Sequence, residues 1–119
     1  MKLFTKAIEK QLAKNGLATR EAQTAGGAEP DHKPVLKIFN PTGAATWLIT
    51  EQIPSEPDLL FGLCDLGMDS PELGYISRAE LEGVRVRFGL KLERDLWFEA
   101  DKPLSGYASE ARAKGRIEA

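Results

Sequence analysis

The stretch VLKIFNPTGAATWLITE, residues 35–51, decides the fold. It contains two runs rich in β-branched and aromatic residues, 35–39 and 45–51, around a proline- and glycine-containing turn at 40–43. A third apolar run, 59–66, follows a second break at 54–58. Because the links are short, we expect the three strands to pair antiparallel as a meander. The third run is largely apolar at both odd and even positions, which predicts a strand that is covered on both faces.

The segment before these strands predicts an amphipathic helix followed by a linker. Within residues 1–17, apolar side chains fall four apart on one helix face, and Thr5 can cap the start. Asn15-Gly16 is expected to end this helix, because glycine is common just past a helix end. Residues 18–34 are polar, contain glycine and proline and lack apolar periodicity, so they predict a flexible connector.

The segment after the strands alternates between helix and strand signals. A short strand is expected at 73–76, and Ser77 with Glu80 forms a capping-box pattern that begins a helix running to about residue 86. Residues 92–99 alternate loosely and predict another strand, Asp101 is placed to cap a last helix, and Gly115 to end it. The predicted order α-β-β-β-(β)-α-β-α is an α+β domain with a small, mainly antiparallel sheet covered by helices. We expect one globular domain, with residues 35–119 as its main body.

Composition narrows the function classes. The chain has 119 residues, a net charge of −2 and 42% apolar residues, as expected of one cytosolic domain. No apolar run approaches the roughly 20 residues that span a membrane, so we expect no membrane association. With one cysteine, Cys64, and one histidine, His32, the chain cannot form an internal disulfide or a zinc site of three or four Cys/His ligands. We predict no cofactor and no metal, and we expect Cys64 to be a buried, inert thiol.

Charge is distributed unevenly along the sequence. Residues 38–77 contain six acidic side chains and no lysine or arginine. This segment predicts either a solvated sheet edge or an acidic face for a partner protein with a basic surface. The residues expected on such a face are Glu51, Asp65, Asp69 and Glu72, and the aromatic residues that could anchor an interface are Trp47, Tyr75 and Trp97.

Two alternatives to protein binding stay open. The first is nucleic-acid binding through the cations of the last third, which are Arg85, Arg87, Lys91, Arg94, Arg112, Lys114 and Arg116. The second is a small carboxylate- or metal-dependent hydrolase, in which Asp65 and Glu72 would be essential. The acidic residues match no spacing that is diagnostic of such chemistry, so enzymatic activity is the less favoured reading.

Several long strings resemble one family. They are LKIFNPTGAATWLITE (36–51), FGLCDLG (61–67), PELGYIS (71–77), ERDL (93–96) and PLSGYA (103–108). Over residues 35–117 the chain resembles the domain of unknown function DUF2958, and residues 3–16 resemble that family's N-terminal helix. The resemblance implies a bacterial protein carried by plasmids and integrative elements beside genes for maintenance, transfer and counter-defence. It assigns no catalytic residue, and Trp97 stands where similar chains often have a histidine, which further disfavours an enzyme.

The leading hypothesis from the sequence is therefore a non-enzymatic interaction protein of a bacterial mobile element. Its expected partner is a host or element protein with a basic surface. A protein that occupied the nucleic-acid site of a defence complex would act in counter-defence, as an anti-CRISPR or anti-restriction factor. The alternative within the same setting is a nucleic-acid-binding accessory protein for plasmid maintenance or transfer.

Overall fold

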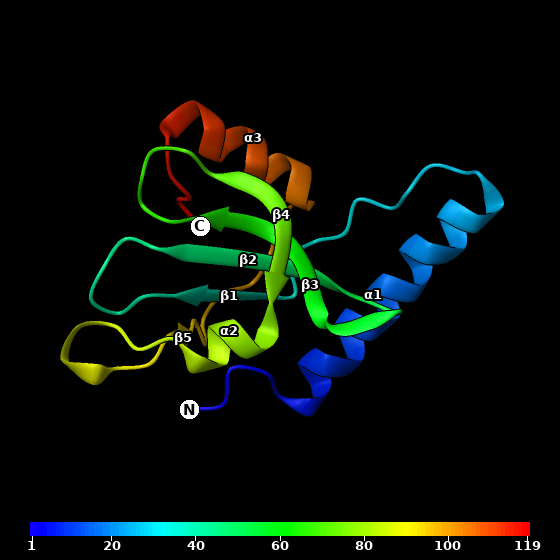
Figure 1. The fold of residues 1–119 in the computed structure, drawn as a ribbon. Coiled ribbons are helices and arrows are strands. Elements are labelled where there is room, and N and C mark those ends of the chain that lie inside the picture. The colour runs from blue at the N-terminus through cyan, green and yellow to red at the C-terminus, as the bar shows by residue number, and fades with distance from the viewer.

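A five-stranded antiparallel sheet forms the centre of the protein (Figure 1). The computed structural model describes residues 1–119. The strands are β1 (Leu36–Phe39), β2 (Thr46–Ile53), β3 (Glu56–Asp65), β4 (Glu72–Ser77) and β5 (Glu93–Arg94). Their order in the sheet is β4-β3-β2-β1-β5, so the first four strands form the meander that the short links predict. The predicted α+β class is confirmed.

Helices cover both faces of the sheet. They are α1 (Lys6–Ala25), α2 (Arg78–Gly83) and α3 (Leu104–Lys114). A core of 11 buried residues joins the first part of α1 and α2 to one face, and a core of six joins α3 to the other. Leu60 belongs to the first core and Leu63 to the second, and both are almost completely buried. The expectation that this strand is covered on both faces is confirmed.

The first helix is longer than the sequence predicts. Thr5 caps it as expected, since Ile8 N donates to Thr5 Oγ1 at 3.2 Å. The helix then continues through Asn15-Gly16 and ends at Ala25, with Gly26 in the left-handed conformation (φ 71°). The predicted end at residue 17 was wrong, and residues 18–25 are helical rather than a connector.

Close packing on β2, rather than helix termination, explains Asn15-Gly16. A Cβ atom on Gly16 would lie 1.8 Å from the backbone oxygen of Gln52, so only glycine lets the two backbones approach this closely. Asn15 Nδ2 donates to the backbone oxygen of Thr50 at 2.9 Å. The pair therefore fixes the middle of α1 against β2.

The segment 27–34, which leads from α1 to β1, contacts the start of α3. Leu104 N donates to the backbone oxygen of His32 at 2.9 Å, and Ser105 N donates to Asp31 Oδ1 at 3.2 Å. Asp31 is therefore the residue that caps α3. The predicted cap, Asp101, was wrong: Pro103 occupies the N-cap position, and Asp101 instead accepts a hydrogen bond from the Tyr107 hydroxyl at 3.0 Å. The left-handed Gly115 ends α3 as predicted.

Between β4 and β5, the helix is shorter than the sequence predicts. Ser77 accepts from Glu80 N, but Asp58 of β3 completes the helix start by accepting from Ser77 Oγ and Ala79 N at 2.7 and 2.9 Å. Helix α2 ends at Gly83, not near residue 86. Residues 84–91 instead form a hairpin whose tip is a single 3-10 turn, η1 (Arg87–Gly89).

The predicted strand 92–99 is reduced to the two residues of β5. A turn follows directly, because Trp97 N donates to Asp95 Oδ1 at 2.8 Å. This turn projects Leu96 and Trp97 into solvent, with Trp97 93% exposed. None of the three helices has the combined length and apolarity needed to cross a membrane.

Candidate protein-binding edge and its clefts

The structure does not bring the four predicted acidic residues together on one exposed face. Asp69 and Glu72 are exposed, but Glu51 is 8% and Asp65 only 2% exposed. Glu72 pairs with Cys64 across β3 and β4, so it shares the face of Cys64 and lies on the opposite face from Asp65. The predicted acidic face was therefore wrong as a continuous surface.

Asp65 is a structural residue. Its Oδ1 accepts a hydrogen bond from Gly67 N at 2.8 Å, and its Oδ2 accepts one from Ile117 N at 2.9 Å. One carboxylate thus joins the turn after β3 to the segment after α3. Because both oxygens accept backbone N–H groups, the cost of burying the charge is offset locally.

Glu51 lies at the other end of the same sheet face. A β-bulge between Ile49 and Glu51 shifts the register, so that Glu51 pairs with Phe61 and shares the α3 face. No backbone N–H donates to its carboxylate in the structure. Burial raises the pKa of Glu51 above its ordinary value, and the Thr19 hydroxyl and the nearby His32 act in the opposite direction.

Two adjoining cavities, of about 360 and 90 Å³, meet at Glu51. We call them the larger and the smaller Glu51 cavity. Both lie between the C-terminal half of α1 and the sheet, and both are lined by Thr19, Gln23, Glu51, Ile53 and Tyr75. The smaller cavity is also lined by Glu29 and Phe61.

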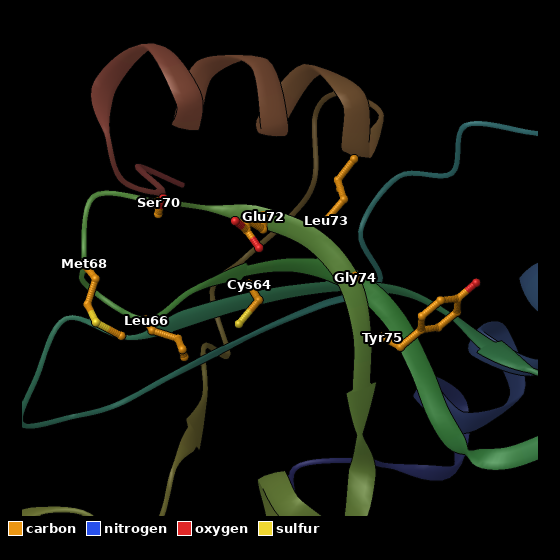
Figure 2. Close-up of a pocket in the computed structure, with 8 residues that line it drawn as sticks. All are labelled: Cys64, Leu66, Met68, Ser70, Glu72, Leu73, Gly74 and Tyr75. Carbon is orange, nitrogen blue, oxygen red and sulfur yellow. The ribbon is translucent and has the colours of Figure 1, made fainter.

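The outer side of β4 is open, because this strand is at the end of the sheet and pairs only with β3. A third cavity, of about 430 Å³, flanks this edge and is shown in Figure 2. Leu66, Met68 and Leu73 line it, and each is exposed. Tyr75 is 68% exposed and lines this cavity as well as both Glu51 cavities. Figure 2 shows its ring directed to the opposite side of β4 from Cys64.

Cys64 lines the third cavity without being activated. Burial raises the pKa of its thiol, and the nearby carboxylates of Asp65 and Glu72 raise it further, whereas the Trp47 side chain lowers it. These surroundings favour the unreactive thiol form that the sequence predicts. Trp47 itself is buried in the 11-residue core between the sheet and helices α1 and α2, so its assignment as an interface aromatic was wrong. Tyr75 and Trp97 are exposed.

The cations proposed for nucleic-acid binding form two separate groups. Arg85, Arg87 and Lys91 lie on the 84–91 hairpin, with the half-buried Arg94 just beyond it in β5. The second group lies around the C-terminal end of α3, at the other side of the sheet in Figure 1. There Lys114 and Arg116 each form an ion pair with Glu118.

Sequence reasoning missed one residue in the first group. Phe88 lies at the tip of the 84–91 hairpin and is 84% exposed, with the Arg87 guanidinium 5.6 Å from its ring centroid. Both Phe88 and Gly89 have positive φ, at 64° and 70°. The alternating Val84-Arg85-Val86-Arg87 before a glycine was the available hairpin signal.

The arrangement around Thr19 differs from that of a nucleophilic triad. Thr19 Oγ1 lies 3.1 Å from His32 Nε2. The same hydroxyl also lowers the pKa of Glu51. The hydroxyl is therefore between the base and the acid, whereas a triad needs the histidine in the middle. This cluster was missed because the predicted helix ended before residue 19. No three His, Cys, Asp or Glu side chains are grouped so that they could hold a metal ion.

Comparisons with known proteins give one informative match. A search of curated proteins and a search of solved structures each returned no significant match. The family model described as a protein of unknown function, DUF2958, matches residues 3–118, which is almost the whole chain. The chain therefore belongs to the DUF2958 family.

Proposed function

We propose that this protein is a non-enzymatic binding module that captures an extended segment of a partner protein along β4. The observation that supports the proposal is the open edge of β4 with its exposed Leu73 and Tyr75 and the cavities beside them. An open edge presents unpaired backbone N–H and C=O groups that a second chain can satisfy. Exposed side chains beside the edge add apolar contact and selectivity to that pairing.

A partner segment with basic side chains fits this edge best. No lysine or arginine occurs between residues 38 and 77, which include β2, β3 and β4. Glu72 lines the cavity beside β4, and Glu51 lines the cavities on the other side of Tyr75. The excess of negative charge in this part of the sheet favours a basic partner and disfavours an acidic one. A nucleic-acid-binding defence protein would offer basic segments of this kind, which makes counter-defence on a mobile element the setting of this proposal.

The test is selection of peptides on the purified protein from a random, phage-displayed library. We expect enrichment of sequences that combine alternating apolar residues with lysine or arginine. Leu73→Lys and Tyr75→Ala should each weaken the binding of a selected peptide at least about tenfold, or 1.4 kcal/mol. Phe88→Ala is the matched control, because it removes another exposed aromatic ring that lies on the 84–91 hairpin rather than on β4.

Backbone amide exchange gives the second readout. Strand addition should protect outward-facing amides of β4 when the peptide is bound, whereas binding elsewhere should leave them unchanged. Selected peptides that bind the Leu73→Lys and Tyr75→Ala variants as tightly as the original protein would contradict the proposal.

Phe88 favours a second candidate function, which is contact with single-stranded nucleic acid through the 84–91 hairpin. An exposed ring among Arg85, Arg87 and Lys91 combines the stacking surface and the positive charge that such binding uses. Fluorescence anisotropy with a labelled single-stranded oligonucleotide at low salt would test it. We expect binding that weakens steeply with salt and is reduced by Phe88→Ala but not by Tyr75→Ala. Absence of binding at low salt would rule this function out.

A further inference from the structure

We infer that the smaller Glu51 cavity is a pocket for one guanidinium group, supplied by an arginine side chain of the partner segment. The inference rests on the proposed function only for the source of the arginine. The recognition of guanidinium by the cavity can be tested without any partner.

The size and lining of the smaller cavity match this group. Its volume of about 90 Å³ corresponds to about three water molecules in the liquid, which suits a planar group of four heavy atoms. Two carboxylates, Glu29 and Glu51, and two aromatic rings, Phe61 and Tyr75, line it. The ring centroids of Phe61 and Tyr75 are 5.5 Å apart in an edge arrangement of 67°. Arginine is the side chain that combines paired hydrogen bonding to a carboxylate with stacking on aromatic rings.

The electrostatics of Glu51 favour a positively charged ligand. The residue is only 8% exposed, yet no backbone group donates to its carboxylate and neither lysine nor arginine lines the smaller cavity. Two basic groups lie in this region: His32 contacts Thr19, and Arg20 lines the larger Glu51 cavity but not the smaller one. A buried carboxylate without a paired cation is costly, and a cation that enters the cavity would offset that cost.

The strand register gives a route from the sheet edge to Glu51. Glu51 pairs with Phe61, and Phe61 pairs with Tyr75, so the three side chains form one row across β2, β3 and β4. Side chains opposite one another in a sheet share a face. Since strands are about 4.8 Å apart, Glu51 lies about 10 Å inward from β4. The cation must therefore extend over both rings to reach Glu51, which favours arginine, the longest cationic side chain.

The experiment titrates N-ethylguanidinium into the ¹⁵N-labelled protein and follows backbone amide signals by NMR. We expect saturable shifts at Thr19, Phe61 and Tyr75. Glu51→Gln should weaken binding at least about tenfold, or 1.4 kcal/mol, because glutamine keeps the shape and removes the charge. Glu56→Gln is the matched control, since it makes the same change at an exposed acid in the β2–β3 hairpin and should leave binding unchanged.

Three outcomes would overturn the inference. They are non-saturable shifts, equal binding by the original protein and Glu51→Gln, and equal binding of N-ethylammonium, which would indicate a site for a point charge rather than for guanidinium. The two proposals fail separately. Peptides that pair with β4 while N-ethylguanidinium fails to bind would overturn only the pocket, whereas guanidinium binding without any selectable peptide would overturn only strand addition.

Discussion

The two ends of one sheet face each contain a buried acid, and the two acids are held differently. Asp65 accepts backbone hydrogen bonds on both carboxylate oxygens and joins two distant segments. Glu51 is almost as well buried but has no backbone donor, and it faces two cavities. A buried acid with backbone partners stabilises the fold, whereas one that lines a cavity without them is available to a ligand. The presence of backbone hydrogen-bond donors, rather than the degree of burial, therefore distinguishes the structural acid Asp65 from the candidate binding acid Glu51.

Replacing Asp65 should have the largest effect. Asp65→Ala leaves a buried gap and removes the charged acceptor of the Gly67 and Ile117 N–H groups, which should lower the free energy of unfolding by about 3 kcal/mol. Urea denaturation followed by circular dichroism measures the change. Glu72→Ala, at an exposed acid of the neighbouring strand, should change stability far less. If the two substitutions lowered the free energy of unfolding equally, the structural role proposed for Asp65 would be contradicted.

The packing of α1 on β2 beside the larger Glu51 cavity can be tested separately through Gly16, which lines that cavity. In Gly16→Ala, the new methyl group overlaps the Gln52 backbone oxygen, so α1 must move away from β2, which should cost about 2 kcal/mol. Thermal and urea unfolding would report this loss. Gly83→Ala is a suitable control, because a Cβ at that position meets nothing within 4 Å. A Gly16→Ala protein as stable as the control would contradict the close approach of α1 and β2.

The cap of α3 offers a third test, at the segment that also carries Glu29. Asp31→Ala removes the acceptor for Ser105 N and should destabilise the protein by about 1 kcal/mol. Hydrogen exchange of the Ser105 amide should quicken in parallel. Lys33→Ala changes an exposed neighbour and should affect neither quantity. Unchanged exchange at Ser105 would show that another group caps the helix.

The smallest effect, and one of opposite sign, is expected at Glu51. Because the pKa of Glu51 is raised, the folded state holds its proton to higher pH than the unfolded state, and folding stability falls as pH rises through the folded pKa. Glu51→Gln removes this penalty and should raise the free energy of unfolding at pH 7, by less than the changes expected at Asp65, Gly16 and Asp31. The gain should shrink as the pH approaches the ordinary glutamate value of 4.5.

Urea titrations at several pH values measure this difference, with Glu56→Gln as the control for lost surface charge. If Glu51→Gln destabilised the protein at pH 7, Glu51 would have a structural role like that of Asp65. The distinction between the two ends of the sheet face would then disappear.

The strands were predictable because their signals are local. Short apolar runs separated by proline and glycine define β1 to β4, and the short links between them favour antiparallel pairing. Thr5 begins α1 and Gly115 ends α3 through local geometry, so both roles were also predicted correctly. Asn15-Gly16 was misread because a glycine that permits close packing has the same local pattern as a glycine that ends a helix. Only the contact with Gln52 distinguishes the two.

The candidate site was less predictable because it depends on distant contacts. The acidic character of residues 38–77 could be predicted from the sequence. The β-bulge beside Thr50, which places Glu51 on the α3 face, could not, because the pattern of apolar and polar residues does not indicate it. Likewise, Asp31 caps a helix that begins more than 70 residues later. His32 and Thr19 meet only because α1 extends past Gly16.

The tip of the 84–91 hairpin holds a residue that lowers the stability of the turn. Phe88 holds a positive φ of 64°, a conformation that asparagine or glycine adopts with less strain, and it leaves a large ring in water. Folding alone would favour one of those smaller residues. A phenylalanine at this position is therefore a departure from the most stable turn, as expected if the ring makes the nucleic-acid contact proposed above.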